Sequence, residues 1–600
     1  KTYSKFEPTT CLYGQLSFCD SPNKPVTEGS LLKLRILRNL YKNLRIFDSL
    51  NHLPKSPLVN QILNPKCIVR PKSQRKIPKQ IVSNFPLNQS QIDIILEISK
   101  DLLSGKPSIS LIHGPPGTGK TRVIANLVLQ IYSHISSKKR NSKMPLKDKI
   151  LLCAPSNAAI DSLVLRLLEI RQSLPSDKRF KLIRVGPPET IHRHVREIAS
   201  QTLAAKEVGN TLDAENIKID LRLLAAEETS LSYAVECARN ENARKRFTIE
   251  LATIQEKKRN LESLMRDQGG GNQSNQARAK MIREAETKVI QGAEIIATTL
   301  SSCYARKLIE SMSEHQHLKF SYCIVDEATQ GIEQEVLLPL LHNITGIVLV
   351  GDPLQLAPTI LSESGKKYNL RRSVFHRIWR EWESNGNIVN RPFFALNIQH
   401  RMHPEIAMFP NEEFYHGKLV TPDFLNVQLP FLPYCVLSHC YKQNPDGESN
   451  TKESELVVKL LCELNKAAEF KGLTIGVIVP YQRQKQIMEK TISSLCDEIK
   501  YTKVNTVDSY QGQEKDVIIF SCVRTEGIGF LSDRLRVNVA LTRARKCLIV
   551  VANFSSLQAD STWKSLCHNA KQRGLFQEIP SSPGNLVDLL KPHDKRNKSC

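Results

Sequence analysis

The feature that most constrains the fold is a glycine-rich loop between two apolar segments. Residues 111–123 read LIHGPPGTGKTRV, where the pattern GxxxxGK[ST] begins at Gly114 and ends at Lys120 and Thr121. Glycines let backbone N–H groups converge on phosphate oxygens, the lysine meets the β- and γ-phosphates, and the threonine hydroxyl ligates Mg²⁺. The run SISLI before the loop predicts a strand, and VIANLVLQI after it predicts a helix. The stretch therefore predicts a nucleotide-binding loop. Its remaining residues are Pro115, Pro116, Gly117, Thr118 and Gly119.

Charge and composition indicate the kind of partner. The chain carries 84 Lys and Arg against 60 Asp and Glu, a formal net charge of +24, and such an excess usually meets a polyanion. Its 15 cysteines form no CxxC pair, which predicts neither a zinc nor a disulfide framework and favours a reducing compartment. No apolar run approaches the ~20 residues of a membrane span and no signal peptide is visible, so no membrane partner is expected. The first residue is Lys rather than Met, as in a fragment of a longer chain.

Six hundred residues exceed one hydrophobic core, so several domains are expected. Residues 1–80 hold 15 Lys or Arg against four acids and predict a basic, β-rich accessory subdomain. Strand-like and helix-like runs alternate over 81–186, resume over 292–370 and form a second series over 371–580 that starts with FFALNIQHRM, a pattern typical of parallel sheets. Helix-favouring composition over 187–291 predicts an inserted helical arm, with GGGNQSNQ at its tip. Residues 581–600 are predicted to be a basic tail.

A second motif narrows the chemistry. In YCIVDEATQ an apolar strand ends in Asp326 and Glu327. One carboxylate can hold Mg²⁺ while its neighbour deprotonates the attacking water. The pair therefore favours hydrolysis over transfer to an acceptor, whereas the glycine-rich loop alone also fits kinases, GTPases and transporters.

Polar residues after later strands add further candidates. Gln355 in GIVLVGDPLQLAPT can sense the γ-phosphate through its amide. Arg401 in ALNIQHRMHPE and Arg543 and Arg545 in RVNVALTRAR can supply positive charge across a cleft. An arginine of this kind contributes roughly 10³ to 10⁵ in rate.

Six motifs in this order resemble those of the superfamily 1 helicases. They are the glycine-rich loop, DEA, GDPLQL, QHRMHP, SYQGQE and NVALTRAR. The sequence is similar to the up-frameshift-like branch and within it to the senataxin-like helicases, through APSNAAID at 154–161 and FLSDRLRVNVALTRARKCLIVVANFSSL. The resemblance covers residues 85–575. His400, Leu354 and Ala357 depart from the family pattern without removing a charged catalytic group.

The resemblance implies a fold and a set of site residues. The fold is α/β, two RecA-like parallel-sheet domains with an N-terminal β-rich subdomain, similar to the family's barrel, and the inserted arm, similar to its prong. Gln91 resembles the glutamine that reads adenine, Tyr481 the tyrosine that stacks on it, and Glu514 the acid linked to the ribose or γ-phosphate. Five positions resemble contacts to the nucleic-acid backbone: Pro155, Ser156, Asn157, Thr299 and Thr506.

The resemblance also implies an activity. A chain of this family binds ATP and Mg²⁺, the latter through Thr121 and Asp326, and moves 5′ to 3′ on single-stranded RNA or DNA, unwinding duplexes or RNA–DNA hybrids. It implies a nuclear monomer that works with the transcription machinery at termination and on R-loops. The alternatives are an ATP-gated single-strand RNA-binding clamp without productive unwinding, and a P-loop kinase. The kinase predicts no second arginine-bearing domain, which the sequence does contain.

Overall fold

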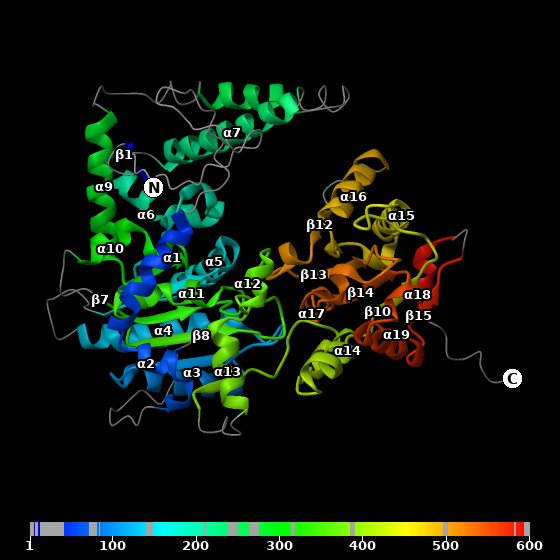
Figure 1. Ribbon diagram of the computed structural model, residues 1–600, viewed down its shortest axis with the longest axis horizontal. Helices are drawn as coiled ribbons and strands as arrows, with labels where there is room; N and C mark the ends of the chain where they lie inside the picture. The colour runs from blue at the N-terminus through cyan, green and yellow to red at the C-terminus, as the bar shows by residue number, and fades with distance from the viewer. Residues whose placement is uncertain are drawn as a thin grey trace, which may run out of the picture. The chain divides into compact units, whose positions relative to one another are not determined.

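The computed structural model describes residues 5–6, 10–11, 41–70, 81–82, 85–139, 148–208, 212–237, 248, 251–262, 275–313, 319–384, 391–495, 502–580 and 584–592. The chain divides into two units, residues 1–45 and 46–600. In the first unit β1 (Lys5–Phe6) pairs antiparallel with β2 (Thr10–Cys11). The second unit contains two parallel sheets, and Figure 1 labels several of their strands and the helices around them.

The first sheet has seven parallel strands in the order β5-β6-β4-β7-β8-β3-β9. Their bounds are β3 (Ser108–His113), β4 (Asp148–Ala154), β5 (Leu182–Val185), β6 (Ile295–Thr299), β7 (Lys319–Val325), β8 (Gly346–Gly351) and β9 (Phe393–Ala395). Most of these strands are buried along almost their whole length, because helices cover both faces of a parallel sheet. This explains the near-continuous apolar runs in the sequence.

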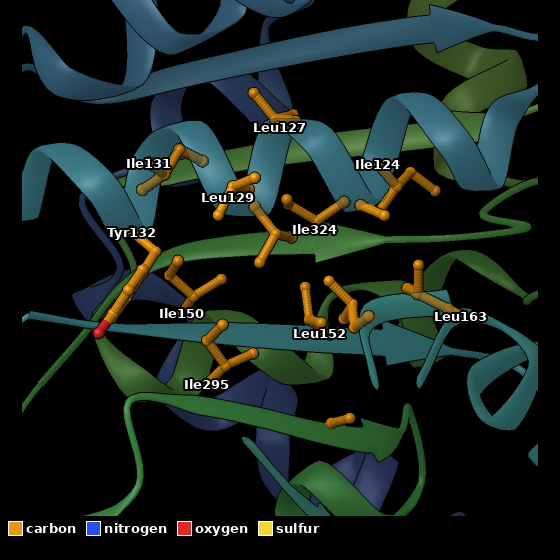
Figure 2. Close-up of a cluster of buried hydrophobic side chains, with 14 of the residues drawn as sticks. Ile124, Leu127, Leu129, Ile131, Tyr132, Ile150, Leu152, Leu163, Ile295 and Ile324 are labelled. Atoms are coloured by element: carbon orange, nitrogen blue, oxygen red, sulfur yellow. The ribbon is translucent and has the colours of Figure 1, made fainter. Parts of the chain in front are cut away.

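Helix α4 (Lys120–Lys139) begins inside the glycine-rich loop and packs on this sheet. Figure 2 shows its side chains, Ile124 and Leu129 among them, lying toward Ile150 and Leu152 of β4 and Ile324 of β7. Each such fully buried side chain stabilises the fold by about 1.5–3 kcal/mol. The start of α4, and with it Lys120 and Thr121, is therefore held rigidly at the carboxyl end of the sheet.

The second sheet has six parallel strands in the order β12-β11-β13-β14-β10-β15. Their bounds are β10 (Tyr434–Ser438), β11 (Ile475–Val479), β12 (Lys503–Thr506), β13 (Lys515–Ser521), β14 (Ala544–Ala552) and β15 (Phe576–Glu578). Two parallel-sheet α/β domains confirm the predicted RecA-like fold class.

Helices connect and cover the strands. They are α1 (Tyr41–His52), α2 (Val59–Leu63), α3 (Gln89–Leu103), α5 (Asn157–Ser173), α10 (Arg306–Ser313), α11 (Glu333–Val336), α12 (Glu363–Lys367), α13 (Val374–Ser384), α14 (Pro404–Tyr415), α15 (Thr451–Lys466), α16 (Gln482–Leu495), α17 (Arg534–Leu541), α18 (Phe554–Leu557) and α19 (Ser561–Gln572). Among the helices in the described ranges, none has the length and apolar character needed to cross a membrane.

The first sheet and its core continue past residue 370, the predicted boundary between the two α/β domains. Phe375 and Trp382 of α13 are buried in the core of the first sheet. Strand β9, expected to open the second domain, pairs with β3 in the first sheet, with Leu111 opposite Phe393. The first sheet therefore extends to Ala395.

The predicted β-rich subdomain over 1–80 is wrong for its last described part. Residues 46–70 are helices and turns, and Leu58, Ile62 and Ile68 are buried in the core of the first sheet. Trp382 Nε1 donates a 2.9 Å hydrogen bond to the Pro65 carbonyl and fixes this packing. Residues 12–40 and 71–80, on which the barrel expectation also rests, lie outside the described residues.

The described part of 187–291 is mainly helical. It contains α6 (Ser200–Glu207), α7 (Leu212–Cys237), helical residues 251–262 and α9 (Asn275–Gly292), whereas the predicted tip at 269–276 lies mostly outside the described residues. Near the C-terminus, Leu586 and Leu590 are buried against the second sheet, so the predicted tail over 581–600 is wrong for that part. The last eight residues lie outside the description.

Candidate functional site

The glycine-rich loop folds as a cradle between β3 and α4. Gly117 and Gly119 have φ values of +73° and +84°, the left-handed region that glycine adopts without steric cost. A Cβ at Gly117 would lie 2.7 Å from the Cβ of Arg401. Lys120 Nζ donates a 2.7 Å hydrogen bond to the Gly114 carbonyl, and this holds the ammonium over the loop. Neither glycine tolerates a side chain, and the loop shape fits a phosphate group.

A cavity of about 580 Å³ opens above this loop. Both domains line it, because its walls include Lys120 and Thr121 from the first domain and Arg401, Glu514 and Arg543 from the chain after it. The other predicted site residues that line it are Gln91, Pro115, Pro116, Gly117, Thr118, Gly119, Glu327 and Gln355. Gly114, Asp326 and Tyr481 are not among its lining residues. The structure thus brings together most of the predicted ATP ligands.

The two carboxylates follow β7. Asp326 is buried, and its Oδ1 accepts a 2.9 Å hydrogen bond from the Glu327 N–H. Burial and the charge of Glu327 raise the pKa of Asp326 to about 7, against the opposing charge of Lys120. Glu327 has φ +50°, unusual for a residue with a side chain, and its carboxylate accepts a 2.8 Å hydrogen bond from Gln330 Nε2. This backbone conformation follows directly from the tight turn after the strand and leaves Glu327 at the cavity wall.

Metal binding by this site would need few protein ligands. Among the described residues no group of three or more His, Cys, Asp or Glu side chains could hold an ion. Mg²⁺ commonly takes one or two protein oxygens and completes its shell with waters and substrate phosphates. The Asp326 carboxylate and the Thr121 hydroxyl are hard oxygen donors of that kind, so the residues present fit Mg²⁺.

Two arginines approach the cavity from the second domain. Arg543 is 2% exposed, and its Nη2 donates to Gln355 Oε1 at 3.1 Å. Burial, together with the nearby charge of Arg401, lowers the pKa of Arg543 to about 9. A buried guanidinium whose partner here is an amide rather than a carboxylate keeps its full positive charge for an incoming anion.

Arg401 is held by Glu514, which also pairs with Arg545. Burial acts to raise the pKa of Glu514, but the charges and hydrogen bonds of the two arginines outweigh it, so that pKa is lower than usual. Arg401 Nη1 also donates to the Thr542 carbonyl at 3.0 Å. Arg401 lines the cavity and Arg545 does not.

A buried hydrogen-bond network joins the two domains behind the cavity. The Asp352 carboxylate accepts hydrogen bonds from His113 Nε2 at 3.0 Å, Gln355 Nε2 at 2.7 Å and the Tyr415 hydroxyl at 2.8 Å. Asn538 Nδ2 donates to the same hydroxyl at 2.8 Å. Burial would raise the pKa of Asp352, but the hydrogen bond and charge of His113, with Lys120 and Gln355, lower it. Sequence reasoning missed Asp352, His113 and Tyr415, since only the fold brings them together.

Gln91 and His400 line the cavity beside the start of α3. Gln91 is buried at the start of α3, and its Nε2 donates to the Thr118 carbonyl at 3.1 Å. The His400 N–H donates to the Gly117 carbonyl at 2.8 Å, and the His400 ring lies 6.2 Å from that of Phe424 at an interplanar angle of 18°. Burial and then the charge of Arg122 lower the pKa of His400, so its imidazole is neutral at pH 7. A neutral aromatic ring therefore borders this part of the cavity.

Tyr481, expected to stack on adenine, lies elsewhere. Its hydroxyl accepts a 3.0 Å hydrogen bond from the Phe530 N–H, and the two rings are 5.7 Å apart. The structure does not bring Tyr481 to the cavity, so the prediction of adenine stacking at this position receives no support. His400 occupies the cavity wall instead, and its departure from the family pattern was the only sequence signal at that position.

The predicted nucleic-acid contacts lie at the carboxyl ends of strands. Pro155 and Ser156 follow β4, and Ser156 Oγ caps α5 by accepting from the Ala159 N–H at 3.2 Å. Thr299 ends β6 beside β4, with Ala154 opposite it, whereas Thr506 ends β12 in the second sheet. The contacts of these residues with nucleic acid remain predictions.

Asn157 is oriented by a buried ion pair that sequence reasoning missed. Arg184 is fully buried, donating from Nε to Asp161 Oδ1 at 2.8 Å and from Nη2 to Asn157 Oδ1 at 2.7 Å. Since the amide oxygen is occupied, the Nδ2 donor of Asn157 is the group left to face a phosphate.

Comparisons with known proteins agree with this geometry. Two family models, each described as AAA domain, match residues 86–363 and 370–555. The chain is 30% identical to "Helicase sen1" of Schizosaccharomyces pombe, and the match covers 94% of this chain and 35% of that protein. It is 28% identical to "Probable helicase senataxin" of Homo sapiens, covering 93% of this chain and 22% of that one. It is also 30% identical to "ATP-dependent helicase upf1" of Schizosaccharomyces pombe over 89% of this chain and 52% of the relative.

The chain therefore spans between about a fifth and about half of the length of these relatives. One assignment accounts for the two parallel sheets and for the phosphate cradle at their shared cavity. It also agrees with the relatives, which match nearly the whole chain. The chain belongs to the senataxin-like group in the up-frameshift-like branch of the superfamily 1 helicases.

Proposed function

We propose that this chain hydrolyses ATP to move 5′ to 3′ on single-stranded RNA or DNA and to unwind duplexes. One observation carries the proposal: a single cavity is lined by the phosphate loop of one α/β domain and by Arg401 and Arg543 beyond it. Since groups on both sides of the cavity would contact the same triphosphate, binding and hydrolysis would change how the two domains are held. That is the coupling a translocating enzyme needs.

In the proposed reaction Glu327 accepts a proton from a water that attacks the γ-phosphorus, and the bond from that phosphorus to the β,γ-bridging oxygen breaks. Lys120 neutralises the β- and γ-phosphate oxygens. Arg543 and Arg401 stabilise the negative charge of the transition state. Mg²⁺, when bound by Thr121 and Asp326, would supply further neutralisation of phosphate charge. Gln355 lies between Asp352 and Arg543, so it is suited to relay the state of the γ-phosphate.

ADP and inorganic phosphate are separate molecules, so they hold the two sides of the cavity together less firmly than one ATP molecule does. Their release would let the domains separate, and repeated closure and opening would move one strand in steps. The contacts between the domains and the nucleic-acid strand act mainly on its phosphates. Binding of the strand is therefore nearly independent of its sequence and sensitive to salt.

Unwinding assays on matched RNA, DNA and hybrid duplexes test the proposal. Each duplex carries a 5′ or a 3′ single-stranded overhang, and strand release is followed with ATP. We expect release from 5′ overhangs only. Lys120→Ala should abolish it together with nucleic-acid-stimulated ATPase, whereas the exposed Lys106→Ala, outside the cavity, should not.

Two other outcomes would change the assignment. ATPase activity without strand release would favour the ATP-gated single-strand clamp. Release from 3′ overhangs would contradict the proposed direction.

We also propose that the chain unwinds RNA–DNA hybrids, acts in transcription termination and is located in the nucleus. These three parts of the proposal rest on the family resemblance alone. Faster release from hybrids than from matched DNA duplexes would support R-loops as a substrate. Imaging of the tagged natural protein tests the nuclear location, and exclusion of the signal from nuclei would contradict it.

The helical arm is proposed to act as a wedge at the duplex junction. Replacing residues 262–280 by a short Gly/Ser turn should keep ATPase activity on single strands and reduce unwinding, because strand separation needs a rigid obstacle. Unchanged unwinding would leave the arm as a passive insertion.

A further inference from the structure

The segment 359–372, directly after the GDPLQL loop, exposes apolar and basic side chains together. Leu361 is 83% exposed and Tyr368 is 79% exposed, among the highest values for large apolar side chains of the described residues. The segment has one acid, Glu363, and four basic residues: Lys366, Lys367, Arg371 and Arg372. An aromatic ring among cations is the surface that single-stranded nucleic acid recognises, with bases on the ring and phosphates on the cations.

Backbone hydrogen bonds hold this segment in a defined turn. Ser362 Oγ caps α12 by accepting from the Gly365 N–H at 3.2 Å, and the Tyr368 N–H donates to the Ser364 carbonyl at 3.0 Å. Asn369 then takes φ +57°, a conformation that asparagine tolerates, and the Leu370 N–H returns to the Gly365 carbonyl at 2.9 Å. The exposed tyrosine is thus presented from a structured turn.

The segment lies at the sheet edge that holds the predicted nucleic-acid contacts. It follows β8, and the sheet order β6-β4-β7-β8 places β8 two strands from β4. At about 4.8 Å per strand, the end of β8 is roughly 10 Å from the end of β4, where Asn157 begins α5. α12 is labelled in Figure 1.

Ion pairs extend the segment toward the contact predicted in the second domain. The Asp533 carboxylate accepts from both Arg371 and Arg536. Arg536 in turn pairs with Asp508 at 3.0 Å, and Asp508 lies two residues after Thr506. The segment therefore lies between the predicted contacts of the first domain and that of the second.

We propose that residues 359–372 form a further contact for single-stranded nucleic acid, in which Tyr368 stacks on a base and Lys367 and Arg372 contact phosphates. Arg371 is engaged by Asp533 and Lys366 by Glu363, whereas Lys367 and Arg372 have no ion-pair partner within the described ranges. The two free cations complement the phosphate charge. This contact rests on the proposed function, because it requires that the chain bind nucleic acid.

Binding of a fluorescent single-stranded oligonucleotide tests the stacking contact. Tyr368→Ala should weaken binding by about 5- to 160-fold, the range for loss of one stacked base. Tyr368→Phe, which keeps the ring, should stay within about 2-fold of the unchanged chain. Phe47→Ala is the matched control, since Phe47 is 69% exposed in α1 and lies outside the segment.

Salt dependence tests the phosphate contacts. Removing Lys367 and Arg372 together by alanine should reduce the slope of log K against log[salt] by about 1.4, since each phosphate contact to a single strand contributes about 0.7. The control pair Lys106→Ala and Lys178→Ala removes exposed charges near the amino ends of β3 and β5, and its slope should not change.

The outcomes separate this inference from the proposed function. If the unchanged chain and Tyr368→Ala bind the oligonucleotide equally well, the proposed contact is overturned. The helicase proposal then remains intact. Equal losses in Tyr368→Ala and Tyr368→Phe also overturn it, because the phenylalanine retains the ring. An unchanged chain that binds no oligonucleotide overturns both.

Discussion

The Tyr415 hydroxyl donates a 2.8 Å hydrogen bond to Oδ2 of Asp352, and both groups are buried. Tyr415 ends α14, after the chain has left the first sheet, whereas Asp352 follows β8 in the first sheet. The same carboxylate accepts from Gln355, which contacts Arg543. A short chain of hydrogen bonds thus links the loop after β8 with the arginine that the second domain presents to the cavity.

Replacement of Tyr415 by Phe should remove this link. The buried Asp352 carboxylate loses one donor and Asn538 loses an acceptor, at a cost of about 1.5–3 kcal/mol for a hydrogen bond to a charged group. We expect a lower melting temperature and a larger loss in stimulated ATPase turnover than in ATP affinity. Tyr434→Phe is the matched control, because the buried Tyr434 hydroxyl makes no hydrogen bond within the described structure. Equal effects of the two substitutions would contradict a role for the link.

Replacement of Glu327 by Gln should stop hydrolysis while ATP still binds, since an amide cannot take the proton of the attacking water. The left-handed backbone at residue 327 is kept, because Gln and Glu have the same shape. ATPase turnover and nucleotide binding are measured on the same preparation. Glu335→Gln, a change outside the cavity, serves as the control. Normal turnover in Glu327→Gln would mean that another group is the base.

Replacement of His400 by Ala should weaken ATP binding by about 0.5–1.5 kcal/mol, the contribution of one aromatic stack. Turnover at saturating ATP should change less, because His400 lies beside Asn88 at the start of α3 and is not among the groups proposed to act on the γ-phosphate. Tyr481→Ala should leave ATP binding unchanged, since the ring of Tyr481 lies against Phe530. The reverse pattern, measured as nucleotide Kd values, would restore Tyr481 as the stacking residue.

Local patterns predicted the elements that depend on near neighbours in the sequence. The loop at 114–121 needs a strand before it and a helix after it, and β3 and α4 are both present. Asp326 and Glu327 follow β7 for the same reason. In each case the residues that determine the structure are contiguous, so the sequence contains the required information.

Features that depend on distant pairing were missed. Strand β9 carries the same apolar signal as a strand of the second sheet, and only its pairing with β3 assigns it to the first. Residues 46–70 have few long apolar runs, and their burial depends on α13, more than 300 residues further along the chain. Tyr415, Asn538 and Asp352 meet for the same reason, through tertiary contacts that no local pattern records.

The two neighbouring arginines of RVNVALTRAR provide the last test. Arg543 is buried, contacts Gln355 and lines the cavity, whereas Arg545 is about half exposed and pairs with Glu514. Replacement of Arg543 by Ala should cut turnover by roughly 10³ or more and affect ATP affinity comparatively little, because its charge is needed most in the transition state. Arg545→Ala should cost far less, since Glu514 keeps its bond to Arg401.

The measurements are kcat and the nucleotide Kd of both variants, with melting temperatures to exclude a folding defect. A loss in Arg543→Ala confined to ATP affinity would assign this residue to ground-state binding. Equal losses of turnover in the two variants would contradict a special role for Arg543 through its position at the cavity. The difference between two arginines two residues apart therefore isolates what contact with the cavity contributes.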